Sequence, residues 1–234
     1  MLQVTSRWFA LLLLSASFAA TATEQTNWVT SWTASVQGPY PVGNPSAQPD
    51  LSLVFPSAET GARDQSFRLI VKPELWGAKS RMRFANALGT QSVTFDGTFV
   101  GLQWSGSAVM PGTNRSITFG GKNSVTVAPG ESVWSDAVTL PFVTKGKELR
   151  GRKLAVSFHV AGSSGPMTWH AKAIQSSYVT SPGAGSKGGD VSEAAFPFAS
   201  ASWYFLNAVD MAAPKGLAAI VAFGDSITTA LPRP

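Results

Sequence analysis

The sequence predicts a mainly β protein with a jelly-roll-like β-sandwich. Short stretches that alternate apolar and polar residues recur between positions 28 and 211, and turns rich in Gly, Pro, Asn and Ser separate them. No window of twelve residues in that range keeps an apolar stripe at helical spacing. Many short strands joined by regular turns are typical of sandwiches and jelly rolls.

Three segments show the alternation most clearly: residues 67–71, 81–84 and 154–160. Each is expected to present one apolar face to a core and one polar face to water. On this pattern His159 falls on the polar face of its strand. Further strands are expected at residues 29–34, 92–102, 116–119, 124–127, 133–140, 168–173 and 202–211.

The first twenty-two residues are expected to be a signal peptide. Arg7 supplies a positive flank, residues 8–20 an apolar core, and Ala20-Thr21-Ala22 a small-x-small cleavage site. The apolar run is too short to span a bilayer, and no later stretch reaches the roughly 18 apolar residues that a membrane helix needs. We therefore expect a secreted or periplasmic protein without a membrane span.

The composition excludes several kinds of site. Cysteine is absent, so cysteine-based metal sites and thiol nucleophiles are excluded and stability must rest on the hydrophobic core. His and carboxylate residues show no ligand spacing, so neither a metal nor a cofactor is expected. The formal net charge is +5, but the Lys and Arg residues are scattered, and no nucleic-acid partner is expected.

Two stretches are expected to be loops. Residues 37–56 are rich in proline and are interpreted as an extended surface excursion. Residues 181–190 place Gly183, Gly185 and Gly188 in the G-x-G-x-x-G spacing of phosphate-binding turns. Such a turn needs a helix N-terminus after it, whereas a proline at 197 interrupts the sequence before two helical turns are complete. We favour a plain loop.

The pattern changes near residue 210. Residues 210–216 have the composition of a linker, and residues 217–223 form a continuous apolar run that is typical of a strand covered on both faces. The turn Gly224-Asp225-Ser226 follows. Functional groups collect beyond the carboxyl ends of such strands, where a serine backbone N–H can point at a developing oxyanion. An ordinary Asx-type turn is the alternative.

"FGDSIT" at 223–228 resembles the first block of the GDSL, or SGNH, hydrolase family of serine esterases and lipases. Other segments resemble the amino-terminal β-domain of secreted two-domain members: residues 28–35, 81–89, 117–121, 134–138 and 202–211. The resemblance implies that Ser226 is the nucleophile and a backbone oxyanion donor, supported by the turn residues Gly224 and Asp225. It further implies a β-sandwich accessory domain at 23–212 and the first strand of an SGNH-type α/β hydrolase domain at 213–234.

The family activates its serine with a histidine in an Asp-x-x-His motif, which this sequence lacks. Val156 and Met167 stand three places before the two histidines, His159 and His170. A serine without a base is a weak nucleophile. We therefore expect an inactive fragment of a secreted esterase or lipase. Its partner would be an ester substrate, with acylated carbohydrate among the candidates.

A non-catalytic carbohydrate-binding β-sandwich is the rival interpretation. All but one of the eight tryptophans follow the expected signal peptide, and exposed indoles can stack on sugar rings. Tryptophans in strands are more often packing residues, so this interpretation ranks second. The seven are Trp28, Trp32, Trp76, Trp104, Trp134, Trp169 and Trp203.

Overall fold

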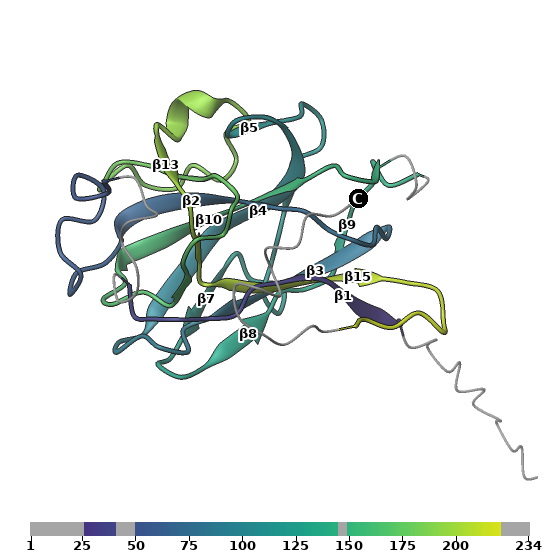
Figure 1. Ribbon diagram of the computed structural model, residues 1–234, viewed down its shortest axis with the longest axis horizontal. Helices are drawn as coiled ribbons and strands as arrows, with labels where there is room; N and C mark the ends of the chain where they lie inside the picture. The colour runs from purple at the N-terminus through teal and green to yellow at the C-terminus, as the bar shows by residue number, and fades with distance from the viewer. Residues whose placement is uncertain (1–25, 41–49, 145–148, 221–234) are drawn as a thin grey trace, which may run out of the picture.

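A computed structural model of the chain describes residues 26–40, 50–144 and 149–220. This part of the chain is a sandwich of antiparallel sheets and contains no α-helix, which confirms the mainly β fold class (Figure 1). No helix within these ranges has the length and apolar character needed to cross a membrane. The expected signal peptide and residues 221–223 of the hydrolase strand expected at 217–223 lie outside the described residues, whereas residues 217–220 form no strand and are exposed.

One layer is a five-stranded sheet in the order β1-β15-β3-β8, with β9 also paired to β3. Its strands are β1 (Trp28–Thr33), β15 (Leu206–Ala212), β3 (Lys79–Ala85), β8 (Ser132–Trp134) and β9 (Val138–Thr139). The first and the last described strands are therefore antiparallel neighbours, with Trp28 opposite Ala212. The sandwich is closed by residues that are far apart in the sequence.

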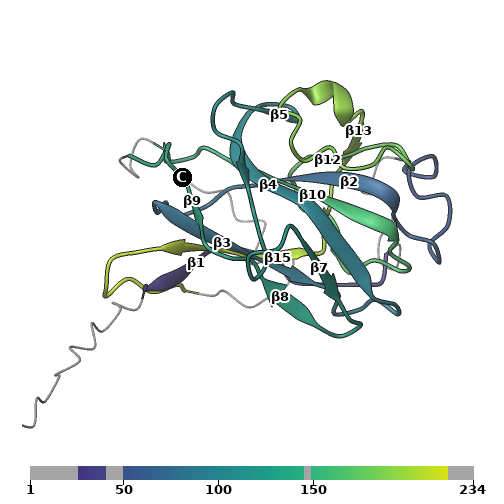
Figure 2. The ribbon, with the colours of Figure 1, turned by 180° about the vertical axis from the view of Figure 1, so that it is seen from behind.

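The other layer is an eight-stranded sheet built on the long central strands β2, β10 and β4, which run side by side in both ribbon views (Figures 1 and 2). The strands are β2 (Arg63–Val71), β4 (Val93–Ser105), β5 (Ala108–Val109), β6 (Arg115–Ser116), β7 (Ser124–Val127), β10 (Leu154–Ser163), β12 (Ser177–Val179) and β13 (Phe198–Ser200). A two-stranded sheet, β11 (Trp169–His170) with β14 (Trp203–Tyr204), lies outside both layers' strand order.

The core between the layers is rich in phenylalanine. Phe67, Phe84, Phe95, Phe158 and Phe205 are almost completely buried. The Phe67 and Phe158 rings stack with centroids 5.2 Å apart, and the others meet edge to face or tilted. Since burying one such side chain contributes about 1.5–3 kcal/mol, this cluster supplies the stability that a chain without cysteine needs.

The proline-rich stretch at 37–56 differs from the surface excursion that the sequence predicts. In its described part, Leu51, Val54 and Phe55 are buried in the core. Phe55 packs against Phe67 and Tyr204. Prolines exclude regular strand pairing, but they do not prevent apolar side chains between them from covering one end of the sandwich.

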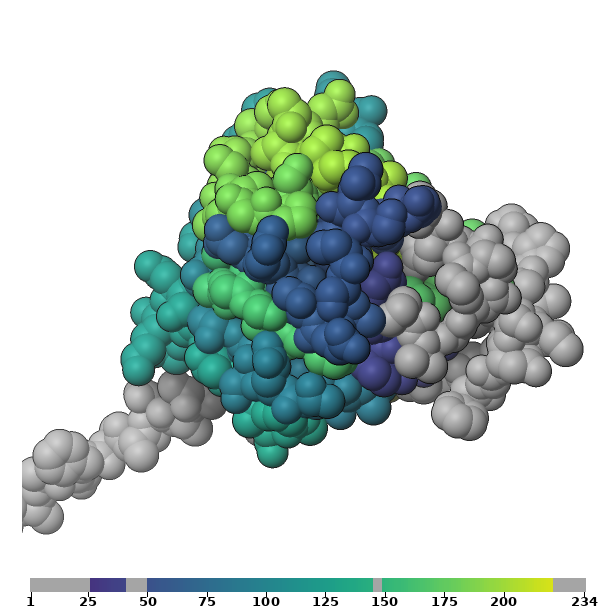
Figure 3. All heavy atoms as spheres, turned by 90° about the vertical axis from the view of Figure 1, so that its left-hand side faces the viewer, coloured from purple at the N-terminus to yellow at the C-terminus, as the bar shows by residue number. Residues whose placement is uncertain are grey.

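The expectation of one water-facing side is wrong for the central strands β2 and β10. Residues 65–71 of β2 and 154–160 of β10 are all buried, so both faces of these stretches are covered. The outer face of their sheet is covered by the segment 181–196, whose carbonyl groups accept hydrogen bonds from Ser66, Arg68 and Ser107. Figure 3 shows the light-green atoms of this part of the chain gathered at the top of the molecule. Alternating polarity records which face is polar. It does not reveal whether another part of the chain covers that face.

Candidate functional site

The serine predicted to be the nucleophile, Ser226, and its turn residues Gly224 and Asp225 lie outside the described residues. The structure therefore bears on the other groups that a reaction or a ligand would use. These are the two histidines, the segment over the eight-stranded sheet, and the outer face of the five-stranded sheet.

His159, on β10, lies between the carboxylates of Asp64 and Asp96. Its Nδ1 lies 2.7 Å from Asp96 Oδ1 and its Nε2 lies 2.8 Å from Asp64 Oδ1. The sequence places His159 on the polar face correctly, but that face is covered and the residue is only 5% exposed. Both ring nitrogens lie within hydrogen-bond distance of a carboxylate oxygen. The ring therefore has no free nitrogen to accept a proton from a serine.

The same cluster joins three neighbouring strands, because Asp64, His159 and Asp96 come from β2, β10 and β4. Asp64 has a φ of 48°, a left-handed conformation that aspartate tolerates better than most residues. A bulge in the pairing of β10 with β4 lies between Ser157 and His159. The arrangement acts as a structural ion cluster, and sequence reasoning missed it because its three members are far apart in the chain.

His170 is anchored at one side of the sandwich, on β11. Its Nδ1 lies 2.5 Å from the Ser35 carbonyl oxygen, so Nδ1 carries the hydrogen and donates it. The ring stacks on Trp203 with centroids 5.5 Å apart. Within the described ranges, no carboxylate forms an ion pair with it. His170 thus lacks the acidic partner that orients the histidine of a catalytic triad.

Arg68 is a fully buried cation on the outer face of β2. Its Nε donates to Ser157 Oγ at 2.8 Å, its Nη1 donates to the Ser107 carbonyl oxygen at 2.8 Å, and its Nη2 donates to the carbonyl of Asp190. Its guanidinium lies 4.0 Å from the centroid of the Phe196 ring. Burial lowers the pKa of Arg68 to about 10, while the nearby negative charge of Asp190 opposes that shift. Arg68 therefore fastens the segment 181–196 to the sheet.

The glycine-rich stretch 181–190 belongs to this covering segment. Carbonyl groups of Gly188 and Asp190 point at the Arg68 guanidinium, at 3.5 Å in the case of Gly188. An anion-binding turn would instead direct N–H groups at its ligand. A Cβ on Gly188 would lie 2.1 Å from the Gly97 carbonyl oxygen, so glycine is required there by close backbone approach. A three-residue 3-10 helix, η3 (Glu193–Ala195), follows in place of an α-helix.

The outer face of the five-stranded sheet carries a row of stacked side chains. The guanidinium of Arg81, on β3, lies 4.8 Å from the centroid of the Trp28 ring and 4.3 Å from that of Trp134. Its Nη2 and Nε donate to Asp210 Oδ2 at 2.8 and 3.0 Å. Asp210 is 3% exposed and also accepts a hydrogen bond from Thr30 Oγ1 at 2.8 Å. Arg81 is thus fixed by a buried carboxylate and two indoles.

Arg83 extends this row by one more cation. Strand register places it directly opposite Trp134. Its Nε and Nη2 donate to Ser132 Oγ at 3.1 and 2.7 Å. Among the ion pairs of the described residues, none includes Arg83. We call Trp28, Arg81, Arg83 and Trp134 the tryptophan–arginine strip. All four side chains are half-buried, as expected for the polar face of residues 81–84.

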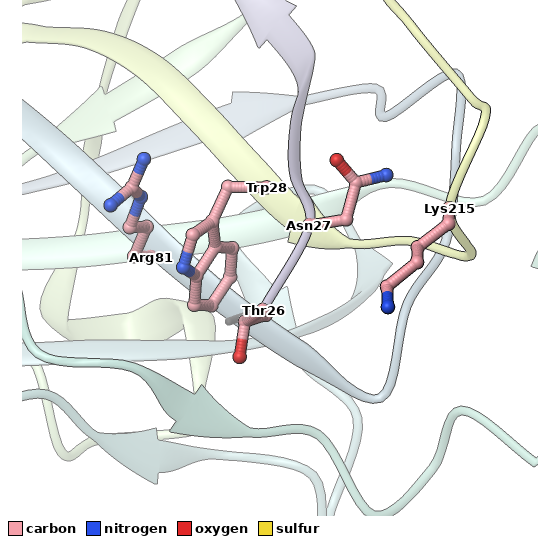
Figure 4. Close-up of a pocket in the computed structure, with 5 residues that line it drawn as sticks. All are labelled: Thr26, Asn27, Trp28, Arg81 and Lys215. Carbon is pink, nitrogen blue, oxygen red and sulfur yellow. The ribbon is translucent and has the colours of Figure 1, made fainter. Parts of the chain in front are cut away.

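An open hollow of about 690 Å³ adjoins the Trp28 end of the strip. It is lined by Thr26, Asn27, Trp28, Arg81 and Lys215. In the view of Figure 4 the Trp28 indole lies between Arg81 on one side and Asn27 and Lys215 on the other. One aromatic ring surrounded by hydroxyl, amide and cationic groups is suited to a polar, negatively charged ligand.

The remaining tryptophans divide into packing residues and one exposed residue. Trp76 and Trp169 are buried in the core. Trp32 meets Trp203 edge to face at 4.8 Å, and Trp203 Nε1 donates to the Ile70 carbonyl oxygen at 2.9 Å. Trp104, at the end of β4, is 64% exposed. Sequence alone does not separate these cases, because the residues next to a tryptophan do not show whether a distant segment covers it.

The chain matches no model of a known protein family, and no curated protein matches it. Throughout the part of the chain that the structure describes, no group of three His, Cys, Asp or Glu side chains is arranged to hold a metal ion.

Proposed function

We propose that this chain belongs to a secreted serine esterase or lipase of the GDSL type, with Ser226 as nucleophile. The observation that carries the proposal is the block FGDSIT at 223–228, which begins eleven positions after β15 ends at Ala212. β15 lies between β1 and β3, so the five-stranded sheet already has its last strand at that point. Residues 213–220 form no strand. This supports a domain boundary after residue 212, with a catalytic unit beginning beyond it.

The proposed reaction is hydrolysis of a carboxylic ester through an acyl-serine. Ser226 Oγ attacks the ester carbonyl carbon while a base removes its proton, and the backbone N–H of Ser226 donates to the resulting oxyanion. The alcohol then leaves with a proton, and water releases the acid from the serine. The chain supplies two histidines, and both are engaged by other groups, His159 by carboxylates and His170 by a carbonyl. The proposal therefore assigns the base to residues that this sequence does not contain.

Hydrolysis of p-nitrophenyl acetate by the purified 234-residue chain tests this assignment. We expect no release of p-nitrophenol above the uncatalysed rate, and the same result for Ser226→Ala. Measurable turnover that Ser226→Ala abolishes would show that the chain carries its own base. Sequencing the gene past the codon for Pro234 tests the family itself, because the esterase proposal requires an Asp-x-x-His motif downstream.

A non-catalytic carbohydrate-binding sandwich is the second candidate. The observation that favours it is the tryptophan–arginine strip, where two indoles remain half-exposed on one sheet face. Binding on a glycan array by a chain whose natural carboxyl terminus is shown to be Pro234 would support this candidate. The absence of glycan binding, together with a downstream Asp-x-x-His motif, would support the esterase.

A further inference from the structure

The outer face of the five-stranded sheet has the composition of a binding site for a charged sugar chain. We propose that the tryptophan–arginine strip and the adjoining hollow bind an acidic polysaccharide, a polymer whose sugars carry carboxylates. This inference names a ligand for the carbohydrate-binding candidate, and it is independent of any activity of Ser226.

The two indoles supply apolar surface on either side of Arg81. Trp28 lies on β1 and Trp134 on β8, which are the two ends of the strand order β1-β15-β3-β8. The Arg81 guanidinium lies 4.8 Å from the Trp28 centroid and 4.3 Å from the Trp134 centroid, so the two centroids are no more than about 9 Å apart. An indole packs well against the apolar C–H face of a sugar ring and keeps its polar edge in water. The exposed parts of the two rings can therefore contact neighbouring sugars of one polymer.

The charge of the strip favours an anion over a neutral sugar. The charge of Arg81 is balanced by Asp210 at 2.8 Å, but the guanidinium of Arg83 contacts only the Ser132 hydroxyl among its described partners. Lys79 is exposed two residues before Arg81 on the same face of β3. A guanidinium binds a carboxylate through paired hydrogen bonds. Among the ion pairs of the described residues, Asp210 neutralises Arg81 and no carboxylate pairs with Arg83, which leaves a guanidinium charge on this face for a ligand.

The strip is also held in place before any ligand arrives. Arg81 is fixed by two hydrogen bonds to Asp210 and by rings on both sides, and Arg83 is fixed by two hydrogen bonds to Ser132. Long cationic side chains normally lose conformational freedom when they bind, which weakens affinity. Here most of that ordering has already occurred in the folded protein.

Affinity electrophoresis in gels that contain polygalacturonate tests the proposal. We expect the chain to be retarded by polygalacturonate and not by the neutral polymer dextran at the same concentration. Arg83→Gln removes the uncompensated charge, and Trp134→Ala removes one indole. Arg83→Gln is expected to weaken the association constant about tenfold, the effect of losing one hydrogen bond to a charged group. Trp134→Ala is expected to weaken it to a similar degree, because the variant loses an aromatic contact surface. Thermal unfolding of each variant establishes that it is folded.

Matched variants on other surfaces distinguish a specific binding site from nonspecific attraction between a basic protein and a polyanion. Trp104→Ala removes an exposed indole from β4, and Lys122→Gln removes an exposed charge from the turn before β7. Both are expected to bind like the unaltered chain. Equal losses in these controls, equal retardation by dextran, or no retardation by polygalacturonate would each overturn the proposal. So would a dimer in sedimentation that Trp134→Ala dissociates. None of these outcomes changes the esterase assay, because the two readouts are independent.

Discussion

Two arginines on the outer faces of the two sheets, Arg68 and Arg81, have the same sequence context and opposite surroundings. Each lies in a strand that alternates apolar and polar residues, and each side chain points away from the shared core. Arg68 is completely buried under the segment 181–196, whereas 30% of the Arg81 side chain is exposed. The difference arises from what covers each sheet, and the local pattern of the strand contains no information about that.

The two arginines also satisfy their charge differently. Arg68 donates mainly to backbone carbonyls and a serine hydroxyl. These neutral acceptors replace the water molecules that would hydrate the guanidinium in solution. Arg81 forms an ion pair with Asp210 and stacks on two indoles. A buried cation without a paired carboxylate depends on every hydrogen bond it makes. Arg68 should therefore matter more for stability, and Arg81 more for recognition at the surface.

The largest expected effect is from Arg68→Ala. The substitution removes the donors for the carbonyls of Ser107 and Asp190 and leaves a cavity beneath the covering segment. Because each buried acceptor left without a partner costs about 1–3 kcal/mol, we expect a loss of about 3 kcal/mol or more in the free energy of unfolding. Urea denaturation measures this loss. Arg83→Ala, the half-exposed control, should lose less than about 1 kcal/mol. Equal losses would mean that Arg68 does not fasten the segment.

Gly188→Ala should have the next largest effect. The added methyl group would lie 2.1 Å from the Gly97 carbonyl oxygen, so the covering segment must move away from β4. Overpacking of this kind costs about 1–3 kcal/mol. Urea denaturation and hydrogen exchange of residues 181–196 measure the loss and its location. Gly183→Ala would not serve as a control, because Gly183 has a φ of 73°. Ala184→Gly, at a half-exposed neighbour, is suitable, and an equal loss there would contradict the packing argument.

A smaller effect is expected for Arg81→Gln. The variant leaves the Asp210 carboxylate, whose side chain is only 4% exposed, without its cationic partner, and Thr30 still donates to it. We expect a loss of about 1 kcal/mol in the free energy of unfolding, because the glutamine amide can still donate a hydrogen bond to Asp210 in place of the guanidinium. Tryptophan fluorescence should change as well, since two indoles lose their stacking partner. Unchanged fluorescence would contradict the stacked arrangement.

The smallest effect concerns pH. Burial lowers the pKa of Arg68 to about 10, so the folded protein releases this proton before the unfolded chain does. Stability linked to Arg68 therefore rises with pH above about 10, and it is constant at lower pH because both states are protonated there. The difference in unfolding free energy between the unaltered chain and Arg68→Ala should be the same at pH 6 and pH 8. A difference that changes between these two pH values would contradict this reasoning.

Much of the sandwich can be predicted from its alternating strands. Every strand expected from alternation overlaps an observed one, since side-chain alternation and strand geometry have the same period. The strand expected from the apolar run 217–223 differs, because its described residues, 217–220, form no strand. β12 and β13 were missed because strands of three residues are too short to show a period. The run 202–211 is interrupted at Phe205, whose φ of 59° separates β14 from β15. A bulky residue in that conformation is held by its tertiary surroundings, which a local pattern does not record.

The functional groups were less predictable than the strands. The Asp64–His159–Asp96 cluster and the Arg68 contacts depend on register and on a covering segment more than a hundred residues away in the chain. For the tryptophan–arginine strip, the sequence supplied the residue types but not their stacking. Ser226 was identified by a short motif, and the structure describes no residue around it, so its role stays a prediction.

The pairing of β1 with β15 has a consequence for how the protein folds. Trp28 can pair with Ala212 only after the ribosome has synthesised residue 212. The Asn27 side chain likewise donates a hydrogen bond to the carbonyl oxygen of Pro214. Bringing such distant segments together is slow, because the intervening chain must first lose much of its freedom. The five-stranded sheet therefore cannot close during most of synthesis, and chain closure should be the late step of folding.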